Sequence, residues 1–102
     1  MQPVVTTREL RRDILDLAER AVAGEAFVVM RHGRPVALLR KARPEEDLRR
    51  VPIETFRRHI ARSLRQAQQR PHLITWHGRD SVVLAPVPSE LMEQQPDSEE
   101  EL

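Results

Sequence analysis

The sequence predicts an α+β fold in which two tandem strand–helix–hairpin modules pack as an intrachain pseudo-dimer, followed by an acidic C-terminal tail. Two observations predict it. Apolar residues recur at helical spacing in two segments, and each segment is followed by two short apolar runs around a His-Gly-Arg turn. A chain of 102 residues has room for one domain. We expect the first module over residues 1–50, the second over 51–86 and the tail over 87–102.

The first module is expected to open with a short strand at Val4-Val5 and then a helix. Thr6 and Glu9 have the spacing of a capping box, which predicts where the helix begins. Gly24 predicts where it ends. One face of this helix is apolar at i, i+4, i+7, i+8 and i+11, with Leu10, Ile14, Leu17, Ala18 and Ala21.

A hairpin follows, with strands over 27–30 and 36–39 and a tight turn at Gly33. Both strands are apolar at successive positions, so we expect both faces to be covered. Residues 44–50 are predicted to form a short helix because acids come first and bases last, as the helix dipole favours.

The second module repeats this plan. Its helical stripe consists of Phe56, Ile60, Leu64 and Ala67, and Pro71 ends the helix. Strands over 73–76 and 81–84 flank the second His-Gly-Arg turn. Aligning 5–21 with 51–67 and 27–39 with 72–84 gives nine identities in 30 positions. This order and these matches predict an internal duplication.

Charge is segregated along the chain, although the formal net charge is only +1. All 17 basic residues, 16 of them Arg, lie at or before Arg79, whereas residues 80–102 carry seven acids and no base. An Arg-rich source proteome would explain the ratio of Arg to Lys, but it would not explain the segregation. The pattern predicts a polyanionic partner, a tail that shields the basic body, or both.

Composition also excludes several classes of function. The chain has no Cys, its four His include no i, i+4 pair, and no Gly-rich phosphate loop is present. The serines lack a nucleophile signature. We therefore expect no enzyme, no metal and no cofactor. The longest apolar run, Ala26 to Met30, is too short to cross a membrane, so we expect a soluble cytoplasmic protein.

Three stretches are similar, in order, to one protein family. Thr7-Arg8-Glu9-Leu10-Arg11 opens the first helix, Gly24-Glu25 ends it, and the stretch from Val28 to Leu39 contains a basic Gly-Arg-Pro-Val-Ala hairpin. Together they resemble the Phd/YefM family of type II antitoxins. The resemblance implies a homodimeric DNA-binding module that represses its own operon, with a C-terminal arm that folds onto a toxin.

By this resemblance, DNA contacts would fall on Arg8, Arg11, Arg12, Arg31 and Arg34. Asp13 stands where the family often has Asn. After residue 50 the chain departs from the family, because the second module takes the place of the toxin-binding arm. Leu91 and Met92 in the acidic tail are the remaining candidates for contact with a protein partner.

Further candidate DNA contacts come from the residues alone. Residues 55–79 hold six arginines and no acid. Arg58, Arg62 and Arg65 have i, i+4, i+7 spacing, which predicts one stripe on a continuous helix with Arg57 beside it, and Arg79 follows the second turn glycine. The stripe either contacts phosphate or is neutralised by tail acids, and the turn arginines either contact DNA or are solvated. The tail acids are Glu90, Glu93, Asp97 and residues 99–101.

The sequence therefore predicts a DNA-binding antitoxin-like transcriptional regulator that represses its own toxin–antitoxin operon. We expect it to bind duplex DNA at its own operator, as a monomeric pseudo-dimer or as a homodimer. Two alternatives stay open: an antitoxin that acts chiefly by neutralising a cognate toxin, and an adaptor that docks on an acidic protein surface.

Overall fold

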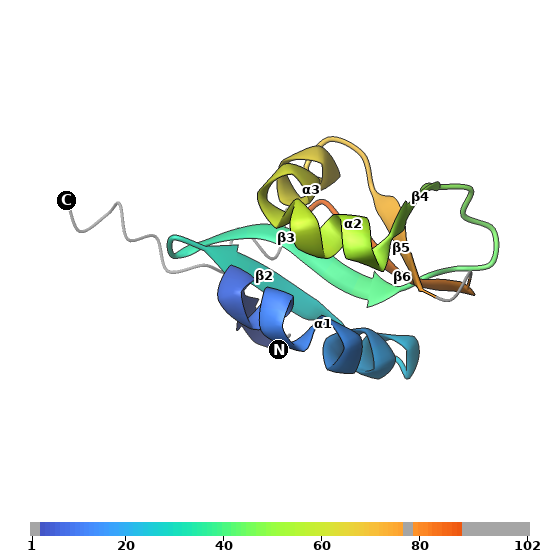
Figure 1. Cartoon of the computed structure of the whole chain (residues 1–102), viewed down its shortest axis with the longest axis horizontal. Helices are drawn as coiled ribbons and strands as arrows, with labels where there is room; N and C mark the ends of the chain where they lie inside the picture. Colours follow the sequence, from blue (N-terminus) through green and yellow to red (C-terminus); the bar gives the residue numbers. More distant parts are fainter. Residues whose placement is uncertain (1–2, 77–78, 89–102) are drawn as a thin grey trace.

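Six strands form one sheet in the order β1-β2-β3-β6-β5-β4, and three helices cover one face of it within the described residues (Figure 1). A computed structural model describes residues 3–76 and 79–88, with the backbone alone at 79–81. The prediction of a mixed α+β fold is confirmed. The elements of the first half are β1 (Val4–Thr6), α1 (Thr7–Val22), β2 (Phe27–Arg31) and β3 (Arg34–Lys41). Those of the second half are β4 (Arg49–Pro52), α2 (Ile53–Arg58), α3 (Ile60–Ala67), β5 (His72–Trp76) and β6 (Arg79–Ala85).

The start of α1 is the predicted capping box. The Thr6 hydroxyl accepts from the Glu9 amide at 3.1 Å, and the Glu9 carboxylate accepts from the Thr6 amide at 2.8 Å. The five residues of the predicted apolar face are all buried. In the β2–β3 turn, His32 and Gly33 both have positive φ, 54° and 77°, which is the geometry of a two-residue hairpin turn that matches strand twist.

The two halves have the same element order and the same strand register. Phe27 pairs with Leu39 in the first hairpin, and His72 pairs with Leu84 in the second. The register shifts directly after Val29 in one hairpin and directly after Ile74 in the other. Each half also adds a short parallel strand at its outer edge, β1 beside β2 and β4 beside β5.

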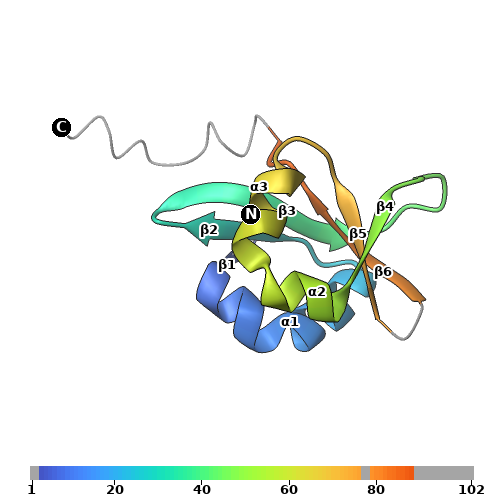
Figure 2. The same cartoon turned by 45° about the horizontal axis from the view of Figure 1, so that its top comes forward.

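Both halves contribute to one hydrophobic core between the sheet and the helices. Figure 2 shows the helices together on one side of the sheet. α1 contacts β6 of the second half, and α3 contacts β3 of the first half. Large side chains from both halves are fully buried in this core, among them Leu10, Phe27, Leu39, Phe56, Leu64 and Leu84. In the described part of the chain, no helix has the length and apolar character needed to cross a membrane.

The opposite face of the sheet is covered in part by the connection over 42–48. Ala42 and Leu48 pack against Leu73, Val83 and Ala85 of the sheet. The prediction of a helix over 44–50 is wrong, because this segment contains only one turn, closed by the Glu46 amide on the Arg43 carbonyl, and Arg49 already belongs to β4. Pairing of β4 with β5 and partial burial of Leu48 outweigh the local helix signal in the charges.

The second helical segment is interrupted, contrary to the prediction of one continuous helix. His59 has non-helical angles, φ −130° and ψ 48°, and separates α2 from α3. α1 has a similar non-helical residue at Asp13, which aligns with His59. Phe56 before the break and Ile60 after it are both buried, so α2 and α3 each pack an apolar face against the sheet. Neither Pro nor Gly marks the position.

Candidate nucleic-acid interface

Three of the predicted DNA-contacting arginines meet at one groove. It lies where the start of α1 and the end of β2 approach α3, and its volume is about 220 Å³. Arg8 and Arg11 come from α1, and Arg31 comes from β2. The groove is lined by Thr7, Arg8, Arg11, Arg31, Ile60, Ala61 and Leu64. We call this feature the Arg8–Arg31 groove.

The arginines of this groove have no acidic partner in the described part of the chain. Within the described residues, Arg8, Arg11 and Arg31 form no ion pair. The N-terminus of α1 lies at the same place, but the Thr6 hydroxyl and the Glu9 carboxylate already cap it. The attraction of the groove for an oxyanion such as a phosphate therefore comes from the guanidinium groups.

Arg12, although predicted as a DNA contact, is held by a neighbouring acid. Its guanidinium pairs with the Asp13 carboxylate at 2.8 Å, outside the groove lining. The hydrogen bond from Arg12 lowers the pKa of Asp13 below its usual value. Asp13 is thus engaged with its neighbour at the break in α1.

The four arginines of the second helical segment lie on two helices rather than on one stripe. Arg57 and Arg58 are on α2, and Arg62 and Arg65 are on α3; all four are exposed. The break at His59 changes the direction of Arg58 relative to the α3 pair. Arg65 follows Ala61 by one helical turn, so it lies on the side of α3 that lines the Arg8–Arg31 groove.

The arginines that follow the two turn glycines are not among the residues that line the groove, although Arg34 is the cross-strand partner of Arg31. Arg34 is exposed and lies with Pro35 and Val36 beside Gln68 and Pro86, around a second depression of about 370 Å³. The backbone of Arg79 pairs with Trp76, and its side chain lies outside the description. Of the tail, residues 89–102 are also outside the described residues, including Leu91, Met92 and the acids expected to shield the arginines.

The second half lacks the same basic set. In the alignment of the two halves, Glu54 stands at the position of Arg8 and Trp76 at the position of Arg31, whereas Arg57 matches Arg11. Trp76 is half-buried and packs against the core. These differences concentrate the positive charge of the aligned positions in the first half.

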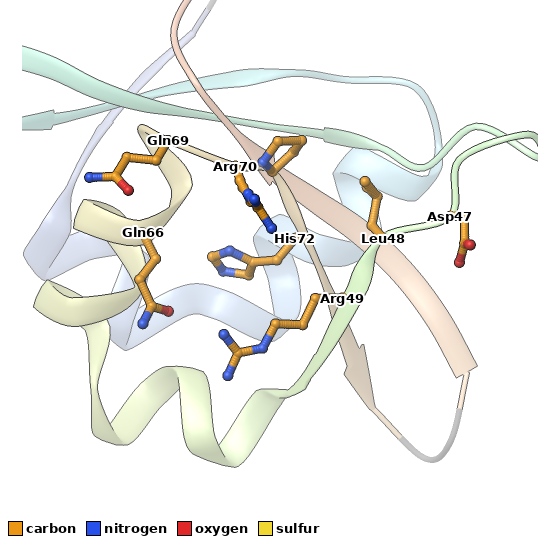
Figure 3. Close-up of a pocket in the computed structure, with 8 residues that line it drawn as sticks. Asp47, Leu48, Arg49, Gln66, Gln69, Arg70 and His72 are labelled. Atoms are coloured by element: carbon orange, nitrogen blue, oxygen red, sulfur yellow. The ribbon is translucent and has the colours of Figure 1, made fainter.

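A further pocket was not anticipated from the sequence. It has a volume of about 400 Å³ and is lined by Asp47, Leu48, Arg49, Gln66, Gln69, Arg70, Pro71 and His72 (Figure 3). His72 is 3% exposed, and burial together with the nearby Arg49 charge lowers its pKa. One signal was available in the sequence: His72 occupies a strand position where the first half has Phe27.

The chain matches no known protein family, no curated protein and no solved structure. Its function is therefore inferred from its residues and their arrangement.

Proposed function

We propose that the protein is a small DNA-binding transcriptional regulator of the Phd/YefM antitoxin type, which binds duplex DNA at its own operator. The observation that carries this proposal is the Arg8–Arg31 groove, which three arginines line without an ion-pair partner among the described residues. Arg is the side chain best suited to bidentate phosphate and guanine contacts. The same three positions are DNA contacts by resemblance to the family.

The proposal includes a pseudo-dimeric arrangement of the two halves within one chain. Leu39 and Leu84, which match in the alignment of the halves, pair directly across β3 and β6. The adjacent pairs Leu38–Ala85 and Arg40–Val83 are exchanged by a two-fold axis through this point. This is the relation that two protomers of a symmetric dimer have at their interface. The equal registers and the matching helix breaks support the same interpretation.

The two halves contribute unequally to DNA binding in this proposal. Glu54 repels phosphate where Arg8 would attract it, and Trp76 packs against the core where Arg31 lines the groove. The first half therefore provides most of the contacts. The exposed arginines of α2 and α3 provide additional phosphate contacts, and Arg65 is one helical turn from Ala61 of the groove lining.

The test is anisotropy of a labelled duplex from the chain's own upstream region, across a salt series. Substituting Arg11→Gln and Arg31→Gln together should weaken binding at least about ten-fold and lower the salt slope by about two, since each phosphate contact contributes about one. The matched control is Lys41→Gln with Arg43→Gln, which removes the same charge from exposed positions outside the groove. We expect the control to bind within about two-fold of the native protein.

Equal losses in the two double variants would reject the groove as the binding site. Absence of binding by the native protein at about 50 mM salt would reject the DNA-binding proposal itself. A steep salt dependence with equal affinity for a scrambled duplex would reject operator recognition.

A further inference from the structure

In the first half, an ion pair closes the space over the Phe27 ring. Arg20 donates to the Glu25 carboxylate from Nε at 3.0 Å and from Nη2 at 2.9 Å. The same guanidinium lies 4.9 Å from the centre of the Phe27 ring. The Arg20 cation is therefore paired with the Glu25 carboxylate and lies over the Phe27 ring, so each of the three groups has a partner at this site.

The second half keeps the positions and changes the chemistry. Gln66 aligns with Arg20, and His72 aligns with Phe27. Arg70 stands two residues before His72, as Glu25 stands two residues before Phe27. The carboxylate is thus replaced by a cation, and the apolar ring is replaced by an imidazole. Arg49, at the start of β4, lies close enough to lower the pKa of His72 through its charge.

The result is a pocket of about 400 Å³ between the end of α3 and the starts of β4 and β5. Figure 3 shows the His72 ring between Gln66 and Arg49, with Arg70 above it. His72 is 3% exposed, and its Nε2 atom is buried with no hydrogen-bond partner among the residues that the structure describes. A buried polar atom without a partner is unfavourable, so a group that satisfies it is favoured. The side chains around the ring, those of Gln66, Gln69 and Arg70, are long and exposed, and their rotation opens the way to it.

We propose that this pocket binds a small molecule that carries a carboxylate or phosphate group. The ligand oxyanion takes the place that the Glu25 carboxylate has in the first half. Arg49 and Arg70 neutralise it, the Gln66 amide nitrogen donates to it, and His72 Nε2 donates to it when that atom carries the ring proton. Asp47, the one carboxylate among the lining residues, lies at the rim beyond Leu48 (Figure 3). This site is separate from the Arg8–Arg31 groove and does not depend on DNA binding.

The experiment is a titration of the ¹⁵N-labelled full chain, at constant ionic strength in chloride, with inorganic phosphate in one arm and succinate in the other. We expect saturable amide shifts centred on residues 47–49 and 66–72 in at least one arm, and the arm with the lower Kd identifies the preferred oxyanion. Arg70→Gln should raise that Kd at least about ten-fold, which corresponds to the loss of one charge-assisted contact. Arg43→Gln, which removes an exposed charge outside the pocket, should leave it within about two-fold.

A second variant separates binding from folding. Gln66→Arg, Arg70→Glu and His72→Phe together install the Arg20–Glu25–Phe27 chemistry of the first half. This chain should stay folded, with a native-like amide spectrum, and should lose saturable binding of both probes. Retained binding would overturn the proposal.

Two other outcomes would also overturn it. Shifts that do not saturate would mean an adventitious ion only. The same holds if the shifts appear equally around exposed arginines such as Arg57 and if Arg43→Gln reduces them as much as Arg70→Gln does. No shift in either arm would mean that the pocket does not take an oxyanion. Because no DNA is present and the groove residues are native in every variant, failure here leaves the test of DNA binding unaffected.

Discussion

At the scale of single residues, the arginines of this chain divide by whether an acid lies next to them. Arg12, Arg20 and Arg40 each have a carboxylate partner, at 2.8, 2.9 and 2.5 Å. The Arg40–Glu46 pair is the least exposed of these, with 16% of each side chain exposed. Glu46 also accepts from the Arg43 amide at 2.9 Å. The hydrogen bond from Arg40 is the main reason that the pKa of Glu46 falls to about 2.

This pair predicts a pH-dependent contribution to stability. The folded-state pKa of Glu46 lies below its ordinary value of 4.5, so the contribution is present above pH 4.5 and is lost as the pH falls towards 2. The pair is partly exposed, and solvent screening reduces its contribution to about 1–2 kcal/mol. Glu46→Gln should lower the free energy of unfolding by that amount at pH 7. The difference from the native protein should shrink as the pH falls below 4.5.

Urea unfolding at pH 7 and at pH 3 measures both effects. Glu45→Gln is the matched control, because Glu45 is exposed and forms no ion pair in the described structure. It should change the free energy of unfolding by less than about 0.5 kcal/mol. A Glu46→Gln difference of equal size at both pH values would contradict the assignment of the pKa shift to this pair.

At the scale of elements, the two halves begin their helices in different ways. α1 has a full capping box between Thr6 and Glu9, whereas α2 begins after Pro52 with no hydrogen bond from a capping side chain. Pro52 nevertheless has extended angles, φ −60° and ψ 146°, similar to those of Thr6. The start of α2 therefore depends on the fixed φ of proline and on burial of Ile53 and Phe56. The start of α1 depends on side-chain hydrogen bonds.

The cap of α1 can be tested directly. Thr6→Ala should destabilise the protein by about 1 kcal/mol, because the Glu9 amide loses its acceptor. Thr6→Ser keeps the hydroxyl and should lie within about 0.3 kcal/mol of the native protein. The denaturant midpoint, followed by circular dichroism, gives both values. Equal destabilisation by Ala and Ser would assign the effect to the lost methyl group instead of the cap.

At the scale of the whole molecule, neither half has a core of its own. α1 contacts β6, α3 contacts β3, and the central β3–β6 pair joins the two hairpins into one sheet (Figure 1). Under the helices, buried residues of both halves form one cluster, and a smaller cluster lies on the opposite face of the sheet. Separating the halves would expose this cluster and leave β3 and β6 as open edges.

We therefore expect that the fragments 1–47 and 48–102 do not fold as monomers. Mixed in equal amounts, they should recover the helical circular dichroism signal of the intact chain, because each covers the apolar surface of the other. Any structure in 1–47 alone should depend on concentration, since the β3 edge must pair with another chain. Sedimentation and circular dichroism over a hundred-fold range of concentration test this. A folded monomer of either fragment would contradict the shared core.

Features that depend on near neighbours could be predicted from the sequence. The capping box at Thr6, the buried face of α1 and the turn at Gly33 each involve residues a few positions apart, and each is confirmed. The strands of the first hairpin likewise lie over the predicted apolar runs, extended by one residue in β2 and by two residues at each end in β3. The mixed α+β class follows from the same local patterns. The pseudo-dimer stays a proposal.

Features that depend on distant parts of the chain were decided by tertiary packing. β4 replaces the helix expected over 44–50 because β5 supplies a partner strand. The second helical segment is interrupted at His59, where neither Pro nor Gly gives a local signal. The same holds for the candidate sites. Arg31 is twenty residues or more from Arg8 and Arg11 in the sequence, and the packing of β2 and α1 brings the three to one groove. Likewise, the pairing of β4 with β5 places Arg49 beside His72 in the second pocket. Periodicity records which face of an element is buried, whereas the neighbours on that face are set by strand pairing and by competition for one shared core.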